Sequence, residues 1–156
     1  MYTRIILDSL INIDIIGDHL ERTLIILKPE VLERGLIGQI LIRFEQKEIK
    51  ICAIKLAMVT KSQAIQHYAH QKSKPFFGEL VAHLISGPVV LLILEGPQII
   101  TIVRKMVGAT LPINTVPGTI RGDFSSTVEK NIIHASDSLT NAEKEIALFF
   151  YDNEII

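Results

Sequence analysis

Residues 86–95 read SGPVVLLILE, and this stretch decides the fold. Gly87 and Pro88 mark a turn, and the residues from Val89 to Leu94 that follow are all apolar. A short apolar run without polar alternation predicts a strand that is buried on both faces of a sheet. The rest of the chain therefore has to supply neighbouring strands and helices that cover them.

Three further segments have the composition of strands. ERTLIILK (21–28) is rich in apolar and β-branched residues and stops at Pro29. IKICAIKLAMV (49–59) and the short run NIIH (131–134) have a similar apolar and β-branched content. With residues 89–95, the chain thus has four predicted strands.

The segments between these strands have helical patterns. Apolar residues at helical spacing predict an amphipathic helix over about 31–47, and they are Ile37, Ile40, Leu41 and Phe44. Thr60 and Gln63 make a capping-box pattern that opens a helix running through His70, which Pro75 terminates. Further helices are expected over 76–86, 97–107 and 141–150.

Residues 108–126 interrupt this alternation. The segment is rich in Gly, Pro and Thr, and a structureless stretch of more than about twelve residues inside a compact domain indicates a functional loop or disorder. We interpret it as a binding loop. The remaining order, βαβααβαβα, favours an α+β fold: a ferredoxin-like split βαβ sandwich with a four-stranded, mainly antiparallel sheet covered by helices.

Composition limits the classes of partner. The chain has 156 residues, of which 48% are hydrophobic, enough for one domain with a buried core. Its net charge of −1 gives no basic excess for nucleic acid or a membrane surface, so an anionic ligand needs a local cluster of cations. The one cysteine, Cys52, lies in an apolar run and is expected to be a buried reduced thiol, in keeping with a reducing compartment.

Residues 1–20 form an apolar N-terminal stretch that we interpret as an extension of unknown role. Asp8, Asp14 and Asp18 interrupt it, so it is not expected to span a membrane. A secretory signal would need a basic start, an uninterrupted apolar centre and a small-residue cleavage site, and a transit peptide would avoid acids, so neither is expected here.

The chain resembles the nucleoside diphosphate kinase family from Glu21 to about Phe150, and the domain is therefore assigned to residues 21–156. The resemblance rests on ordered motifs: ERTLIILKP, RGLIG, HY, KPFF, SGPVV, GATLP, PGTIRGDF, NIIHASDS and AEKEI. It implies the fold inferred above and a Mg²⁺-dependent transfer of the terminal phosphate from a nucleoside triphosphate to a nucleoside diphosphate, deoxy forms included. It also implies a cytoplasmic homo-oligomer, a tetramer or a hexamer.

By this resemblance, His134 in NIIHASDS (131–138) carries the phosphate between two half-reactions. The chemistry suits imidazole, because a phosphoramidate keeps a high phosphate-transfer potential. A serine phosphate ester would be too stable to pass the phosphate to the acceptor. A neutral imidazole near pH 7 is also nucleophilic without a separate base. Glu145 is expected to hold the other ring nitrogen, and Asp137 is expected to reach Mg²⁺ through water.

The family resemblance also assigns the residues that bind the nucleotide. No GxxxxGK[ST] loop occurs, so the phosphates have to be held by residues from distant segments. The phosphates are expected to be contacted by Arg104, Arg121 and Thr110. Lys28 and Tyr68 are expected near the phosphate that is transferred, and Lys28 is also expected to reach the ribose. Asn131 is expected to hydrogen-bond the ribose hydroxyls. The base is expected to pack against Phe76, Leu80 and Val128.

These residues also have other interpretations. An isolated histidine is more often a solvated or core residue, and we assign His19, His67 and His83 to that class. Glu145 could simply pair with a lysine along its helix. At the level of function, the alternative is a nucleotide-binding regulatory module with weak or no turnover, and binding to nucleic acid is disfavoured by the net charge.

Several positions depart from the usual family pattern. Glu30 stands where Asp is common, Ala135 where Gly is common, His70 where an acid is frequent, and Lys74 where Arg is frequent. Ala135 is compatible with the family fold provided that its backbone is β-like. The changes at His70 and Lys74 bear on how the phosphates are positioned.

Overall fold

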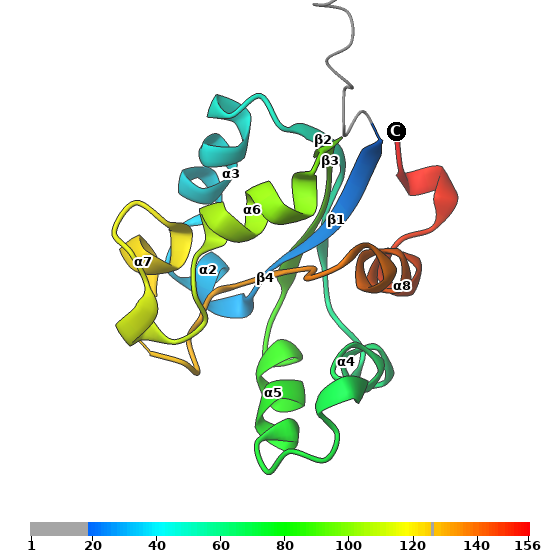
Figure 1. The fold of residues 1–156 in the computed structure, drawn as a ribbon. Helices are drawn as coiled ribbons and strands as arrows, with labels where there is room; N and C mark the ends of the chain where they lie inside the picture. The colour runs from blue at the N-terminus through cyan, green and yellow to red at the C-terminus, as the bar shows by residue number, and fades with distance from the viewer. Residues whose placement is uncertain (1–18, 126) are drawn as a thin grey trace, which may run out of the picture.

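The computed structural model describes residues 19–125 and 127–156, and these form a sheet with helices on both faces (Figure 1). The strands are β1 (Leu20–Leu27), β2 (Lys50–Ala57), β3 (Val89–Pro97) and β4 (Ile133–Ala135). Their order in the sheet is β2-β3-β1-β4, and each neighbouring pair is antiparallel. The predicted α+β class and ferredoxin-like arrangement are confirmed.

The two central strands separate two hydrophobic clusters, as the continuous apolar runs predict. Leu91 and Ile93 of β3 face the cluster with α4, α5 and α8, while Leu92 and Leu94 face the cluster with α3 and α6. Successive residues of a strand point to opposite faces, so a strand that is covered on both sides needs apolar residues at every position. The prediction that β3 is buried on both faces is confirmed.

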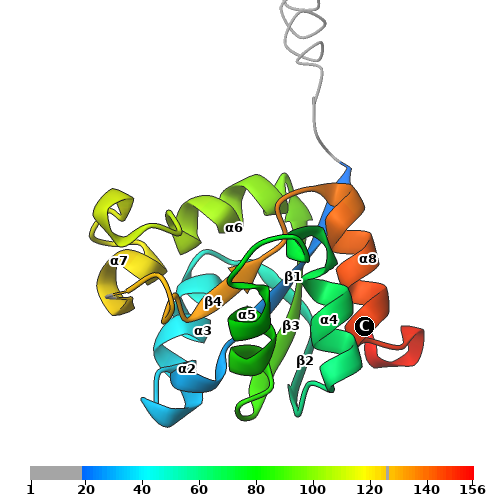
Figure 2. The same cartoon turned by 90° about the horizontal axis from the view of Figure 1, so that it is seen from below.

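Seven α-helices are present in the described part of the chain. They are α2 (Pro29–Glu33), α3 (Ile37–Gln46), α4 (Lys61–His67), α5 (Phe77–Leu84), α6 (Ile99–Val107), α7 (Ile120–Phe124) and α8 (Leu139–Phe149). Three 3₁₀ turns accompany them, at Ala69–Gln71, Pro112–Asn114 and Asp152–Glu154. In Figure 2, β4 runs between α6 and α7 on one side and α4, α5 and α8 on the other.

The prediction of one helix over 31–47 is wrong. Two helices, α2 and α3, occupy this segment, and Gly35 between them has a φ of +64°. This left-handed conformation is accessible to glycine and ends a helix. The apolar spacing from Ile37 to Phe44 correctly located α3, whose residues Ile40 and Phe44 are fully buried.

The binding loop predicted as structureless over 108–126 contains a helix, α7, and that prediction is also wrong. Thr119 precedes α7, and its side-chain oxygen accepts a hydrogen bond from the backbone N–H of Gly122, which satisfies one free donor of the first turn. A helix of five residues with an internal glycine has too little periodicity to be detected from sequence. This short helix carries Arg121.

The remaining boundaries are close to those predicted. The capping box of Thr60 and Gln63 is present, but α4 ends at His67 and a 3₁₀ turn replaces the rest of the predicted helix. Ser138 caps α8, which therefore begins at Leu139 rather than at residue 141. Ala135 lies in β4, so its backbone is extended and the alanine is tolerated there.

The N-terminal extension lies largely outside the described residues, since the description begins at His19 and Leu20 is already the first residue of β1. Cys52 is a fully buried free cysteine, as predicted. Among the helices of the described chain, none is long and apolar enough to cross a membrane.

Candidate functional site

A cavity of about 910 Å³ opens where β4 meets α4, α5, α6 and α8, and the binding loop closes one side of it. Residues from segments far apart in the sequence line it. All twelve predicted site residues are among them: Lys28, Tyr68, Phe76, Leu80, Arg104, Thr110, Arg121, Val128, Asn131, His134, Asp137 and Glu145. The structure therefore brings the predicted residues together around one space large enough for a nucleotide.

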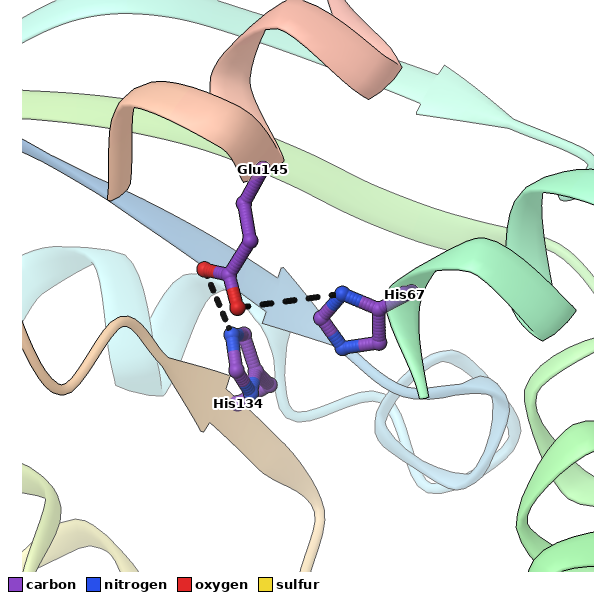
Figure 3. Close-up of side chains that lie close together, drawn as sticks. All are labelled: His67, His134 and Glu145. Carbon is purple, nitrogen blue, oxygen red and sulfur yellow. Dashed lines mark hydrogen bonds and ion pairs between the residues drawn. The ribbon is translucent and has the colours of Figure 1, made fainter. Parts of the chain in front are cut away.

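His134 and Glu145 form a hydrogen-bonded pair on one wall of this cavity (Figure 3). His134 projects from β4, Glu145 from α8, and His134 Nε2 lies 3.0 Å from Glu145 Oε2. An ionised carboxylate can only accept a hydrogen bond, so Nε2 carries the ring proton and donates it. The Nδ1 atom of His134 is left with a free lone pair.

Ser136 holds the carboxylate of Glu145 in place. The Ser136 hydroxyl donates to Glu145 Oε2 at 2.5 Å and accepts a hydrogen bond from the backbone N–H of Leu24 in β1. Burial by itself would raise the pKa of Glu145, but the hydrogen bonds from His134 and Ser136 bring it below its usual value. Glu145 is therefore an anion that fixes the orientation of the imidazole. The sequence motif alone did not predict this role of Ser136.

His67 is a third member of this group, and it was assigned only a solvated or core role. It is buried, and its ring packs edge-to-face on that of His134, with centroids 4.5 Å apart. Burial and the nearby His134 lower its pKa to about 3, so His67 is neutral at physiological pH. The only sequence signal for this residue was its position next to Tyr68 in the HY motif.

The buried His67 should make the fold sensitive to acid. In the unfolded chain this imidazole takes up a proton near pH 6.5, whereas in the folded chain it does so only near pH 3. Its contribution to stability is therefore complete above pH 6.5 and is lost as the pH falls toward 3. At pH 5 the loss amounts to about 2 kcal/mol.

Urea unfolding at pH 7 and pH 5 measures this loss. His67→Phe keeps an aromatic ring in the core. Between pH 7 and pH 5, we expect its free energy of unfolding to fall by about 2 kcal/mol less than that of the wild type. The exposed His19 gives a control, since His19→Phe should lose as much as the wild type. Equal losses for His67→Phe and the wild type would mean that His67 is not a buried neutral base.

Lys28 lies at the inner end of the cavity, immediately after β1. It is 4% exposed and donates a hydrogen bond of 2.6 Å from Nζ to Asn131 Oδ1. Burial lowers the pKa of Lys28 to about 8, so the ammonium is still largely charged at pH 7 but is poorly hydrated. A cation in this state gains more than an exposed one from an incoming phosphate.

Arg121 is a buried guanidinium that organises the binding loop. It donates to the backbone carbonyls of Gly108, Asn131 and Ile133 and to the Thr110 hydroxyl, which engages four of its five N–H groups. Gly108 ends α6 with a φ of +86°, a conformation that suits glycine. Burial lowers the pKa of Arg121 to about 10, and the residue remains a cation. Arg121 therefore ties α7, the loop and β4 together beside the cavity.

Arg104 and Asp137 are more exposed. Arg104 Nη1 lies 3.4 Å from the carbonyl oxygen of Ala135, next to His134. The carboxylate of Asp137 accepts hydrogen bonds from Asn141 and Ser138, which keep its pKa below its usual value. A fixed anionic oxygen ligand at the wall of a cavity suits Mg²⁺, which binds few carboxylates and retains water. The residues present are thus compatible with the predicted metal.

A strained segment precedes His134. Ile132 has a φ of +57°, which is unfavourable for a β-branched residue by roughly 1–3 kcal/mol. Its N–H donates to the buried carboxylate of Glu30, and its carbonyl accepts from the N–H of Lys28. Glu30 also bonds to His83 Nε2 at 2.8 Å, so His83 has a specific partner and lines the cavity. The roles of Glu30 and His83 were not predicted.

The remaining predicted residues form the outer and central walls. Phe76 and Val128 are 44% and 42% exposed and lie with the partly buried Leu80 at the rim. Tyr68, the residue directly after α4, is buried, and burial raises its pKa to about 12, so its hydroxyl stays protonated. The cavity therefore has a cationic interior and an apolar rim.

Comparisons with known proteins agree on one family. Residues 21–155 match the family model described as "Nucleoside diphosphate kinase". A nucleoside diphosphate kinase from Thermus thermophilus is 50% identical over 137 residues, covering 88% of this chain and 100% of that protein. One from Thermoplasma volcanium is 53% identical over 137 residues, covering 88% of this chain and 93% of that protein.

Solved structures show the same similarity. The nucleoside diphosphate kinase of Aquifex aeolicus superimposes with a TM-score of 0.84 at 42% identity, covering 88% of this chain and 99% of that chain. The halophilic nucleoside diphosphate kinase of Halobacterium salinarum in complex with CDP gives a TM-score of 0.85 at 42% identity, with coverages of 88% and 92%.

Proposed function

The chain belongs to the nucleoside diphosphate kinase family, and we propose that it transfers phosphate through a phosphohistidine formed on His134. It is a phosphotransferase that acts between nucleotides, as its relatives at about 50% identity are. The observation that carries the proposed route is the His134–Glu145 hydrogen bond, which leaves Nδ1 unprotonated inside a cavity that also holds Lys28 and Arg121.

In the first half-reaction, the lone pair on His134 Nδ1 attacks the terminal phosphorus of a nucleoside triphosphate. The bond from phosphorus to the bridging oxygen breaks, and the nucleoside diphosphate leaves with the electron pair. The N–H on Nε2 stays hydrogen-bonded to Glu145, whose negative charge stabilises the ring as it becomes more positive. In the second half-reaction, a terminal oxygen of another diphosphate attacks the phosphorus, and the P–N bond breaks.

Positive charge around the transferred group supports this route. Phosphoryl transfer depends mainly on positioning and on neutralising the charge of the phosphate oxygens. Lys28, Arg104 and Arg121 line the same cavity as His134, and Thr110 is held beside Arg121. Asn131, which bonds Lys28, is proposed to bind the ribose hydroxyls. When Mg²⁺ is bound with the nucleotide it neutralises phosphate charge, and Asp137 would hold it through water.

The alternative of a regulatory module without turnover has no observation in its favour. Such a module would be expected to have lost His134, Lys28 or Arg121, and all three are present and line the cavity. The relatives from Thermus thermophilus, Thermoplasma volcanium and Aquifex aeolicus are each named as nucleoside diphosphate kinases.

Initial-rate kinetics test the two-step route. With a covalent intermediate, the first product leaves before the acceptor binds, so double-reciprocal plots at several fixed acceptor concentrations should be parallel. Direct transfer between two bound nucleotides would give intersecting lines, and that pattern would exclude the phosphohistidine route while leaving the family assignment intact.

We expect broad tolerance for the base. Phe76, Leu80 and Val128 offer no side-chain hydrogen bond to the groups that distinguish adenine from guanine, and stacking on Phe76 is worth about 1–3 kcal/mol for either purine. ATP, GTP and their deoxy forms should be used with kcat/KM values within about tenfold of each other, a spread of ~1.4 kcal/mol, and pyrimidines less well. The CDP bound by the halobacterial relative is consistent with a tolerant site.

Phe76→Ala provides the measurement. It should lower kcat/KM by a similar factor for ATP and GTP, while the neighbouring Phe77→Leu, which lies outside the cavity lining, serves as a control for general loss of packing. A hundredfold preference of the wild type for one purine, or a Phe76→Ala effect confined to one of them, would require a polar contact to the base that we have not identified.

A homo-oligomer in the cytoplasm is part of the same proposal. β2 is at the edge of the sheet, and Ile54 and Leu56 on this strand, with Met58 just after it, are 52%, 65% and 64% exposed. A sheet edge with three exposed apolar side chains on one face is typical of a surface that pairs with another chain. This surface supports assembly into the tetramer or hexamer expected from the family.

A further inference from the structure

His67 has two buried ring nitrogens without a hydrogen-bond partner among the described residues. Its side chain is 1% exposed, and Nδ1 lies 3.9 Å from Glu145 Oε1, too far for a hydrogen bond. A buried polar group left unpaired in a folded protein is unfavourable and needs an explanation, and an ion bound between it and its neighbours is one such explanation.

The three side chains in Figure 3 have the arrangement of an incomplete metal site. One ligand atom from each of His67, His134 and Glu145 lies within 4.8 Å of the others. Ligand atoms in a tetrahedral zinc site are roughly 3.4 Å apart, so small side-chain rotations would close this group around an ion. Glu145 accepts from His134 and Ser136 through Oε2, while Oε1 faces His67.

The chemistry of these ligands selects the cation. Two imidazoles and one carboxylate suit Zn²⁺ and the cations that resemble it, whereas Mg²⁺ prefers oxygen ligands and water. Both His67 and Glu145 are already in the ionisation state that a metal requires, since His67 is neutral and Glu145 is ionised. With three protein ligands, the fourth position of a tetrahedral ion would be taken by water.

We propose that the resting protein binds one borderline divalent cation, of which Zn²⁺ is the representative, through His67, His134 and Glu145, and that this ion blocks phosphorylation. The blocking follows from the single proton of a neutral imidazole. A metal on Nε2 of His134 takes the lone pair there, so the ring proton moves to Nδ1 and the lone pair that would attack the phosphate is lost. The blocking part of the proposal rests on the proposed function of His134, and the binding part does not.

Co²⁺ is the probe for binding, because it occupies zinc sites and absorbs visible light when it is tetrahedral. We expect the full chain, freed of metal with a chelator and without nucleotide, to give these absorption bands on addition of Co²⁺ and to lose them when Zn²⁺ is added. His67→Phe should give no bands, and His67→Gln is a second variant should the first not fold. The matched control is His70→Asn, which removes an imidazole lining the same cavity outside the group and should keep the bands.

Phosphorylation is then measured on the same samples. With Mg²⁺ and labelled ATP, Zn²⁺ should suppress labelling of the wild type, and a chelator should restore it. The binding part is overturned if the wild type gives no bands, or if they persist in both His67 variants. Bands that require His67, together with labelling that Zn²⁺ leaves unchanged, would overturn the blocking part. If His134→Ala were labelled as the wild type is, the proposed function would fail, whatever the Co²⁺ spectrum.

Discussion

Replacing His134 with alanine is expected to abolish phosphate transfer. The variant lacks the nitrogen that we propose forms the bond to phosphorus, and the other histidines that line the cavity in the described part of the chain, His67, His70 and His83, lie in different surroundings. His67 is buried, His83 is bonded to Glu30, and the exposed His70 has its Nε2 3.1 Å from the side-chain amide nitrogen of Gln71. Loss of a nucleophile lowers turnover by at least about 10⁴-fold, which corresponds to more than ~5 kcal/mol of transition-state stabilisation.

The measurement is kcat for transfer from ATP to GDP, together with labelling of the protein by ATP alone. His134 is partly exposed and its removal leaves the Glu145–Ser136 bond in place, so nucleotide binding and folding should change little. His19→Ala, at an exposed histidine outside the cavity lining, should retain wild-type activity. Near-normal turnover in His134→Ala would refute the assignment of the carrier.

The second large effect is expected for Glu145→Gln. Glutamine keeps the length of the side chain, but it can present an N–H to His134 Nε2, which favours the ring tautomer with the proton on Nδ1. It also removes the negative charge that, in the proposed route, stabilises the phosphorylated ring. We expect kcat to fall roughly ten- to a thousandfold, or ~1–4 kcal/mol, while nucleotide affinity stays nearly unchanged.

Glu143→Gln is the matched control for this change. It makes the same substitution on the same helix, at an exposed position outside the cavity lining, and should leave kcat and KM unaltered. If Glu145→Gln lowered the affinity for nucleotide without lowering kcat, Glu145 would bind nucleotide or support the fold rather than orient the imidazole of His134.

The strands were predictable because the core leaves a direct signal in the sequence. Residues 24–27 of β1 and 89–94 of β3 are buried on both faces, and each stretch therefore appears as an unbroken apolar run that few other structures would require. The start of α4 was predictable for a similar reason, since the Thr60–Gln63 capping box is a local interaction. By contrast, the break at Gly35 and the helix α7 depend on single residues inside longer patterns, and periodicity does not detect them.

The site was predictable to the extent that motifs identify it. The twelve predicted site residues came from a resemblance to one family, because no local pattern shows that Lys28 will meet Asn131 or that His134 will meet Glu145. The residues that were missed act through contacts across the fold. Ser136 bonds to Glu145, Glu30 supports the strained Ile132, and His67 packs on His134. Such roles depend on tertiary distances that the sequence does not contain.

The central claim, that His134 carries the phosphate, is tested most directly by isolating the labelled protein. After brief mixing with Mg²⁺ and ATP labelled in its terminal phosphate, and removal of free nucleotide, the protein should retain label in a bond that is labile to acid and stable to base. The label should lie on His134 and should pass completely to added GDP. Label that is absent, that resists acid, or that fails to transfer to GDP would contradict this account.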